Sequence, residues 1–123
     1  MIQILFVGLG GCIGSILRFK IGGLILHHTS GWRFPLSTFV VNIVGCALAG
    51  VLAALAEKHD FFSPEIRLFL FTGLLGGFTT FSAFGLETVY LIQRQQFSVA
   101  LFNLLASVLG GIFILWFFLK VVN

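Results

Sequence analysis

Long runs of hydrophobic residues alternate with short polar segments along this chain of 123 residues. The runs cover about residues 2–26, 36–56, 65–93 and 98–122. Each is longer than the roughly 20 residues that an α-helix needs to cross a hydrocarbon core of about 30 Å. The segments between them leave no room for a soluble domain or a linker. The pattern predicts an all-α integral membrane protein, with one transmembrane domain over residues 1–123 that consists of four transmembrane helices.

Composition and charge support a membrane protein and exclude other classes. Hydrophobic residues make up 59% of the chain and charged residues 9%, more apolar surface than a small soluble fold can bury. The net charge is +3, but the basic residues are scattered singly and form no patch for nucleic acid. Cys12 and Cys46 lie inside apolar runs, and we expect them to be small packing residues.

Basic residues are nearly balanced between the two predicted sides of the membrane. Lys58, Arg67 and Lys120 lie on the side of the termini and Arg33 and Arg94 on the other side, while Arg18 and Lys20 lie within the first run and are assigned to neither side. Because an excess of Lys and Arg sets the direction of insertion, this balance permits insertion in both directions and antiparallel pairing of two copies. Four short helices enclose little water alone, so we expect a homo-oligomer.

Glycine and hydroxyl residues cluster at the centre of the third run, which Ser63 and Pro64 are suited to begin. The pair Gly76-Gly77, followed by Thr79-Thr80, disfavours a continuous helix. An interruption frees backbone carbonyls that lipid cannot satisfy and that can bind a cation. If two antiparallel copies met here, a sodium ion on the two-fold axis would satisfy carbonyls from both. We therefore expect a broken third helix.

Two phenylalanines three residues apart, Phe81 and Phe84, lie on one face of the helix that resumes after this cluster. They either pack against lipid and protein or present their positive ring edges to an anion. Neutral hydrogen-bond donors also suit an anion pathway, because a pore must bind its ion weakly enough to release it. The candidates are the Asn42 amide and the hydroxyls of Thr80 and Ser82. Asn42 would serve equally well as a hydrogen-bonding contact between helices.

A narrow polar stripe follows the fourth run. Asn103, Ser107 and Gly110 or Gly111 recur at helical spacing. The stripe either lines a path for a polar solute or forms hydrogen bonds between helices. The first run has a face of small residues around Gly10 and Gly14, which predicts close approach of another backbone.

Two charged residues within the runs, Arg18 and Glu87, are candidates for structural or vestibule roles. Arg18 follows Gly14 by one turn, so it points toward a protein partner or extends to the membrane surface. Glu87 is either a proton or cation carrier or a hydrogen-bond anchor, and its position near one end of the run favours the anchor. The alternative function is a small proton-coupled multidrug antiporter of the four-helix dimeric type. We do not expect an enzyme, because no nucleophile and base or metal-ligand set converges.

The motifs resemble those of the CrcB/Fluc family of fluoride channels. Residues 76–87, GGFTTFSAFGLE, resemble the family pattern GGxTTFSTFSxE, and residues 10–19, GGCIGSILRF, resemble its first-helix pattern GGxxGxxxRY. Residues 40–42, VVN, match the asparagine of the second helix. The chain departs from the family pattern at Phe19, Ala83, Gly85, Asn103 and Gly111.

This resemblance implies an antiparallel, dual-topology homodimer with two pores. It implies passive export of fluoride, exclusion of chloride and fluoride resistance, in a plasma membrane that we expect to be a prokaryotic inner membrane. It also implies a structural sodium ion that is not transported. By motif match, the carbonyls of Gly76 and Thr79 bind sodium, Phe81 and Phe84 contact the anion, Asn42 is the pore amide, and Ser107 belongs to the polar track of the fourth helix.

Overall fold

Four helical spans, each long and apolar enough to cross a membrane, make up the structure, a computed structural model that describes residues 1–59 and 62–123. No strand occurs in these two ranges. The elements are α1 (Ile2–Thr29), α2 (Leu36–Lys58), α3 (Pro64–Arg67), the π-helix η1 (Leu68–Leu75), α4 (Gly76–Phe78), α5 (Phe81–Gln93) and α6 (Phe97–Val122). Elements α3 to α5 together form the third span, Pro64–Gln93. The prediction of an all-helical chain with four spans is confirmed.

The helix ends follow local capping chemistry. The Ser63 hydroxyl accepts a hydrogen bond from the Ile66 amide at 3.3 Å, and Pro64 occupies the first helical position. The helices extend one to three residues beyond the predicted ranges. At the end of α1, the Thr29 hydroxyl donates to the Ile25 carbonyl at 2.8 Å.

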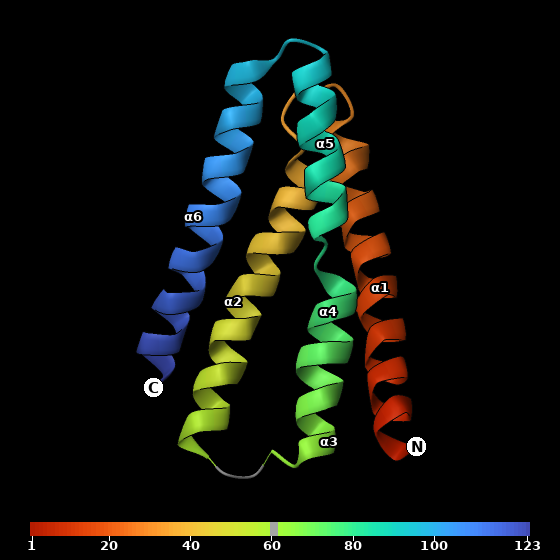
Figure 1. The fold of residues 1–123 in the computed structure, drawn as a ribbon, viewed down its shortest axis with the longest axis vertical. Helices are drawn as coiled ribbons and strands as arrows, with labels where there is room; N and C mark the ends of the chain where they lie inside the picture. Colours follow the sequence, from red (N-terminus) through yellow and green to blue (C-terminus); the bar gives the residue numbers. More distant parts are fainter. Residues whose placement is uncertain (60–61) are drawn as a thin grey trace.

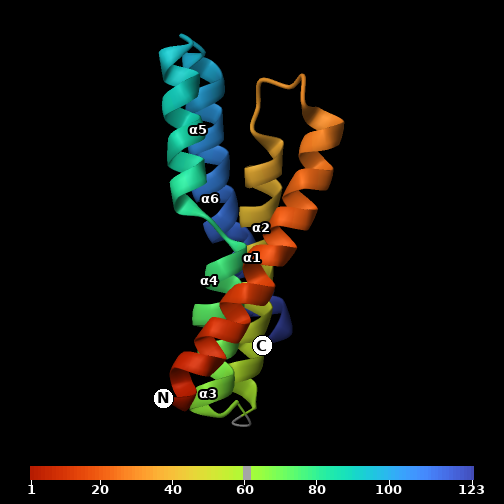
Figure 2. The ribbon, with the colours of Figure 1, turned by 90° about the vertical axis from the view of Figure 1, so that its right-hand side faces the viewer.

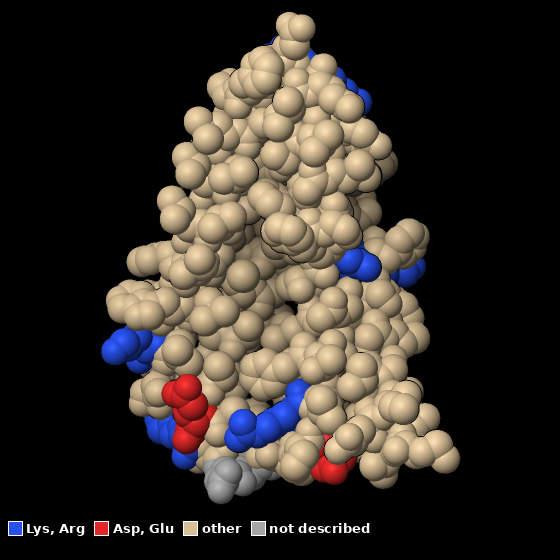
Figure 3. Space-filling view, viewed as in Figure 1, with Lys and Arg blue, Asp and Glu red and all other residues tan. Residues whose placement is uncertain are grey.

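The spans run alternately up and down, so both termini lie at the lower end of the molecule (Figure 1). Near mid-height α1 crosses α4, and above the crossing α1 and α5 lean apart (Figure 2). Lys and Arg side chains gather toward the two ends of the face in Figure 3, with a further group halfway up one side. The same face is hollowed near its centre. Large apolar side chains are exposed along the spans, among them Leu9, Leu101 and Phe113, as expected of surfaces that face lipid.

Glycines bring α1 into backbone contact with the lower half of the third span. A Cβ atom on Gly10 would lie 2.9 Å from the Leu74 nitrogen, and one on Gly14 would lie 2.9 Å from the Phe78 nitrogen. Both glycines are buried. The predicted close approach at this face is confirmed, and its partner is the third span of the same chain.

We predict that Gly10→Ala and Gly14→Ala each lower the free energy of unfolding by about 1–3 kcal/mol, because the added methyl group forces two backbones apart. Gly23→Ala on the same helix is the matched control, since no atom lies within 4 Å of its Cβ position. This control should be neutral or stabilising by up to about 1 kcal/mol. Thermal unfolding in detergent measures the difference, and equal effects at the three positions would contradict this packing.

Candidate functional site

The third span leaves the helical conformation at Thr79 and Thr80. Their φ and ψ angles are −84° and 158° for Thr79 and −148° and 118° for Thr80, both in the extended region. The Asn42 side chain pairs with the Thr80 backbone: its Oδ1 accepts from the Thr80 amide at 2.8 Å, and its Nδ2 donates to the Thr80 carbonyl at 2.9 Å. One side chain from α2 thus satisfies both backbone polar groups of Thr80.

Threonine side chains cap the helices on either side. The Thr79 hydroxyl and the Thr79 amide both donate to the Leu75 carbonyl, each at 2.9 Å, where α4 ends. The Thr80 hydroxyl accepts from the Ala83 amide at 3.2 Å and is the N-cap of α5. The Ser82 hydroxyl lies 3.3 Å from the Thr80 hydroxyl and is exposed. The segment is therefore held by specific hydrogen bonds on both sides.

The same hydrogen bonds deprive two carbonyls of their helical donors. In a continuous helix the Thr80 amide would donate to the Gly76 carbonyl, and the Ala83 amide to the Thr79 carbonyl. Here the Thr80 amide donates to Asn42 and the Ala83 amide to the Thr80 hydroxyl. Gly76 is also exposed. These two carbonyls, the ones that the motif match assigns to sodium, are chemically suited to a hard cation that prefers oxygen ligands.

A pocket of about 250 Å³ lies against this segment and draws residues from α2, α5 and α6. We call it the central pocket, and its lining residues are Asn42, Cys46, Thr79, Thr80, Phe81, Phe84, Ser107 and Val108. All are uncharged. The Asn42 amide has a second N–H beyond the one that it donates to Thr80. The pocket therefore combines neutral donors with aromatic rings.

Phe81 and Phe84 lie side by side in this wall, with ring centroids 5.7 Å apart and planes inclined at 44°. Phe81 is 82% exposed, whereas Phe84 is 9% exposed. The pair spans the boundary between the chain's interior and its surroundings. Phe84 is packed inside the chain, and Phe81 offers a ring to whatever covers this face.

Asn103 does not line the central pocket. It is 1% exposed, and its amide donates to the Thr88 hydroxyl of α5 at 3.1 Å. Ser107, one turn further along α6, lines the pocket and donates to Asn103 Oδ1 at 3.3 Å. In the polar stripe, Asn103 therefore forms a hydrogen bond between helices, and Ser107 lines a cavity.

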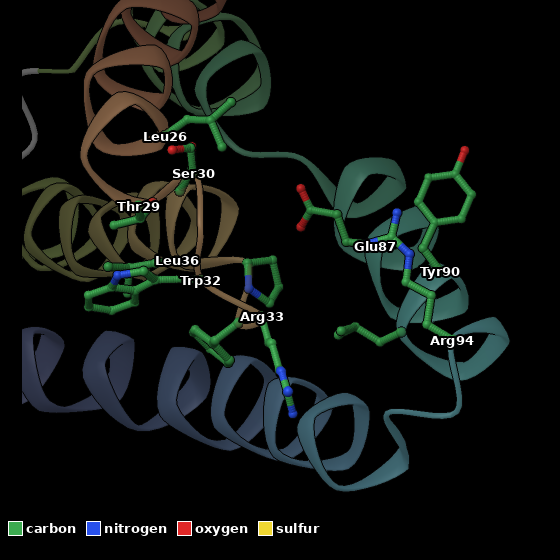
Figure 4. A pocket seen from close by; sticks show the side chains of 13 residues that line it. Leu26, Thr29, Ser30, Trp32, Arg33, Leu36, Glu87, Tyr90 and Arg94 are labelled. Atoms are coloured by element: carbon green, nitrogen blue, oxygen red, sulfur yellow. The ribbon is translucent and has the colours of Figure 1, made fainter.

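Glu87 lies in a different pocket, also of about 250 Å³, at the end of the molecule where α1 joins α2 (Figure 4). Its Oε1 accepts from the Thr38 hydroxyl at 2.6 Å, and its Oε2 is buried without a hydrogen-bond partner among the described residues. The carboxylate points from α5 toward the α1 end of the pocket, whose wall also includes Arg33 and Arg94. The Thr38 contact agrees with the predicted anchoring role.

Arg18 is half-buried and lines a third pocket, of about 320 Å³, on the α1 side of the interruption. Thr38 and Thr80 line this pocket too. Thr80 therefore borders the central pocket on one side and the Arg18 pocket on the other. Arg18 thus lies beside a cavity that is bordered by residues of α1, α2 and α5.

Known proteins share sequence similarity with almost the whole of this chain. The family model of CrcB-like protein, Camphor Resistance, matches residues 5–119. This chain belongs to the CrcB-like family. Relatives named "Fluoride-specific ion channel FluC" include one from Methylobacillus flagellatus, 51% identical over 94% of this chain and 91% of the relative. A relative of the same name from Flavobacterium psychrophilum is 40% identical over 94% of this chain and 93% of the relative. Another from Rhizobium etli is 46% identical over 93% of this chain and 82% of the relative. The family resemblance identified from the motifs is confirmed.

Sequence reasoning missed several residues of the site in this CrcB-like chain. Cys46 was predicted to be a packing residue, yet it lines the central pocket one turn beyond Asn42. Thr38, one turn before Asn42, donates to Glu87. Spacing at four residues already aligns Cys46 with Asn42, and the same spacing between positions 38 and 42 is a signal that could have placed Thr38 on this face. Thr88 had no such signal, because its partner belongs to another helix.

We predict that Asn42→Leu lowers the free energy of unfolding, because it leaves the Thr80 amide and carbonyl without partners. The expected loss is about 1–3 kcal/mol for each orphaned group, measured by thermal unfolding in detergent. Ser82→Ala is the control, since it removes an exposed hydroxyl next to the interruption and should change stability little. Equal stability of Asn42→Leu and Ser82→Ala would contradict the role of the Asn42–Thr80 pair.

Proposed function

We propose that this chain is a fluoride-selective ion channel that exports fluoride passively across the plasma membrane and lowers its cytoplasmic concentration. The observation that carries the proposal is the central pocket, where the Asn42 amide and the Ser107 hydroxyl accompany Phe81 and Phe84. Relatives named as fluoride-specific ion channels support it. Their names as channels also agree with the expectation that the chain is not an enzyme. In a prokaryote the membrane would be the inner membrane.

The chemistry of the pocket suits a small anion that must leave as readily as it enters. Ring edges of phenylalanine carry partial positive charge, and amide and hydroxyl groups donate hydrogen bonds. None of them is a fixed cation that would hold the anion too strongly for conduction. Phe81 and Phe84 line the pocket, and Asn42 has a second N–H beyond the one donated to Thr80. We assign anion contact to these residues and to Ser107, and border positions to Thr80 and Ser82.

Passive export needs no energy coupling. A potential of 100 mV is equivalent to about 2.3 kcal/mol for one charge, and a tenfold concentration ratio to about 1.4 kcal/mol. A channel that passes only fluoride would therefore hold internal fluoride about fifty-fold below external fluoride at this potential. We propose that a ratio of this kind underlies fluoride resistance.

We propose that two copies assemble antiparallel, so that a second chain covers the exposed face of the pocket. Phe81 is 82% exposed beside the pocket, and the balance of basic residues on the two sides permits insertion in both directions. Two such chains would form two equivalent pathways related by a two-fold axis. The surrounding exposed apolar faces would contact lipid.

We further assign the Gly76 and Thr79 carbonyls to a structural sodium ion that is not transported. Both carbonyls lack their helical donors, because the Thr80 and Ala83 amides donate elsewhere. Carbonyls of two antiparallel chains meeting at this point would supply a set of neutral oxygen ligands. When bound, sodium would neutralise the negative ends of these carbonyl dipoles and join the two chains.

The alternative, a proton-coupled antiporter, would need a carboxylate in the cavity that binds substrate. Glu87 is the only carboxylate in a predicted site, and it lies outside the central pocket, hydrogen bonded to Thr38. Uptake of a cationic dye driven by a pH gradient, and lost in Glu87→Gln, would favour the antiporter.

We predict that the purified protein in liposomes releases fluoride and retains chloride, as ion-selective electrodes would measure. Phe81→Ile and Asn42→Ala should reduce the fluoride efflux rate by at least about tenfold, the equivalent of roughly 1.4 kcal/mol of lost anion stabilisation. Phe81→Ile should still elute as a folded dimer, and the efflux of Asn42→Ala, which also removes the partner of the Thr80 backbone, is measured only on the fraction that elutes as a folded dimer. Thr72→Val, on an exposed position of η1, is the control with unchanged efflux. Equal efflux of the two anions from the wild type would overturn the proposal.

We also predict dual topology. Ser30→Cys, in a background without Cys12 and Cys46, places a single thiol in the turn after α1. An impermeant thiol reagent should label about half of the molecules from each side of the membrane if insertion is balanced. Labelling from one side alone would exclude antiparallel pairing.

A further inference from the structure

A chain of three hydrogen bonds joins α6 to α5 directly behind the central pocket. Ser107 Oγ donates to Asn103 Oδ1 at 3.3 Å, Asn103 Nδ2 donates to Thr88 Oγ1 at 3.1 Å, and Thr88 Oγ1 donates to the Phe84 carbonyl at 2.7 Å. The middle of the chain is dry, because Asn103 is 1% exposed and Thr88 is 9% exposed. Both ends belong to residues that line the pocket, Ser107 and Phe84.

The Phe84 carbonyl, which receives the last of the three hydrogen bonds, fixes the donor and the acceptor in each of them. A carbonyl can only accept, so the single hydroxyl proton of Thr88 is used on Phe84. The Thr88 oxygen can then only accept from Asn103, which must present its NH₂ group to it. The Asn103 oxygen therefore faces Ser107, and Ser107 must donate to it. Burial keeps water from supplying a substitute donor or acceptor.

With these donors and acceptors, the Ser107 hydroxyl does not direct its proton into the pocket, where an anion would need it. With its proton on Asn103, the Ser107 hydroxyl presents lone pairs to the cavity, and an anion cannot accept from a lone pair. Anion binding at Ser107 therefore requires the hydroxyl to rotate away from Asn103. The bond that must break is the longest of the three, 3.3 Å against the usual 2.7–2.8 Å for O–H···O.

We propose that Thr88 and Asn103 are positioning residues that hold the Ser107 hydroxyl in a resting orientation, and that this hydroxyl alternates between Asn103 and an anion in the pocket. The inference rests on the proposed function. When Ser107 turns to the anion, the buried Asn103 oxygen loses its donor, and this penalty weakens anion binding. Asn103 thus favours release, which is what conduction requires. The ligand class is a small anion that acts only as a hydrogen-bond acceptor.

The test is Thr88→Val, which keeps the side-chain shape but removes the acceptor for Asn103. The Asn103 amide is then free to turn its NH₂ group toward Ser107, whose proton becomes available to the anion. We expect the fluoride concentration for half-maximal conductance in planar bilayers to fall about two- to tenfold, the range that corresponds to one hydrogen bond. Thr88→Ser keeps the hydroxyl and should restore the wild-type value.

A second experiment introduces Thr88→Val into a protein that already carries Ser107→Ala. It distinguishes an effect of Thr88 that acts through Ser107 from an effect on helix packing. If Thr88 acts through Ser107, adding Thr88→Val to Ser107→Ala should cause no further shift in half-maximal concentration. A shift that persists there, or an unchanged half-maximal concentration in folded Thr88→Val, overturns the inference. Asn103→Leu, which removes the acceptor itself, gives a second route to the same expected shift should Thr88→Val not fold. A wild type without fluoride conductance would instead overturn the proposed function.

Discussion

Two hydrogen bonds join the Asn42 side chain to the Thr80 backbone, and they fall in the middle of a segment long and apolar enough to span a membrane. In hydrocarbon an unpaired amide or carbonyl loses several kcal/mol, so an interrupted helix is stable only if protein groups replace the missing bonds. Asn42 replaces two of them. The extended backbone that precedes α5, and the loss of the helical donor to the Gly76 carbonyl, accompany this pairing.

The two halves of the third span are held by different interactions. Below the interruption, Gly10 and Gly14 let α1 approach η1 and α4 at backbone distance. Above it, α1 and α5 lean apart (Figure 2), and polar side-chain bonds fix α5 instead: Thr38 to Glu87 and Asn103 to Thr88. Close backbone contacts at glycines hold the lower half, and side-chain hydrogen bonds hold the upper half, beside which lie the central pocket and the pocket lined by Arg18. Thr79, whose carbonyl has lost its helical donor, consequently also lines the central pocket.

Much of this arrangement could be predicted from the sequence, because it depends on local signals. Hydrophobic run length gave the four spans, Ser63 and Pro64 marked a helix start, and Gly10 with Gly14 marked a close contact. The glycine-threonine cluster pointed to the third span, although Gly76 and Gly77 are helical and the extended residues are Thr79 and Thr80. The π-helical stretch at 68–75 had no sequence signal.

Contacts between helices were harder to predict. Asn103 and Thr88 are 15 positions apart, and spacing on one helix cannot show which polar group on another helix satisfies it. The partner of Glu87 was hidden for the same reason, although its anchoring role was expected from its depth. The sequence can indicate that a buried polar residue needs a hydrogen-bond partner, but the packing of the helices determines which residue is the partner.

We propose that the pocket beside the Asn42–Thr80 pair conducts fluoride passively and rejects chloride. The most direct measurement is the reversal potential of the purified protein in a planar bilayer, with a tenfold fluoride gradient, equal chloride and equal pH on both sides. Passive, selective conduction predicts zero current at about 59 mV. A reversal potential near zero would contradict selective fluoride conduction, and a reversal potential that shifts when a pH gradient is then imposed would contradict passive conduction.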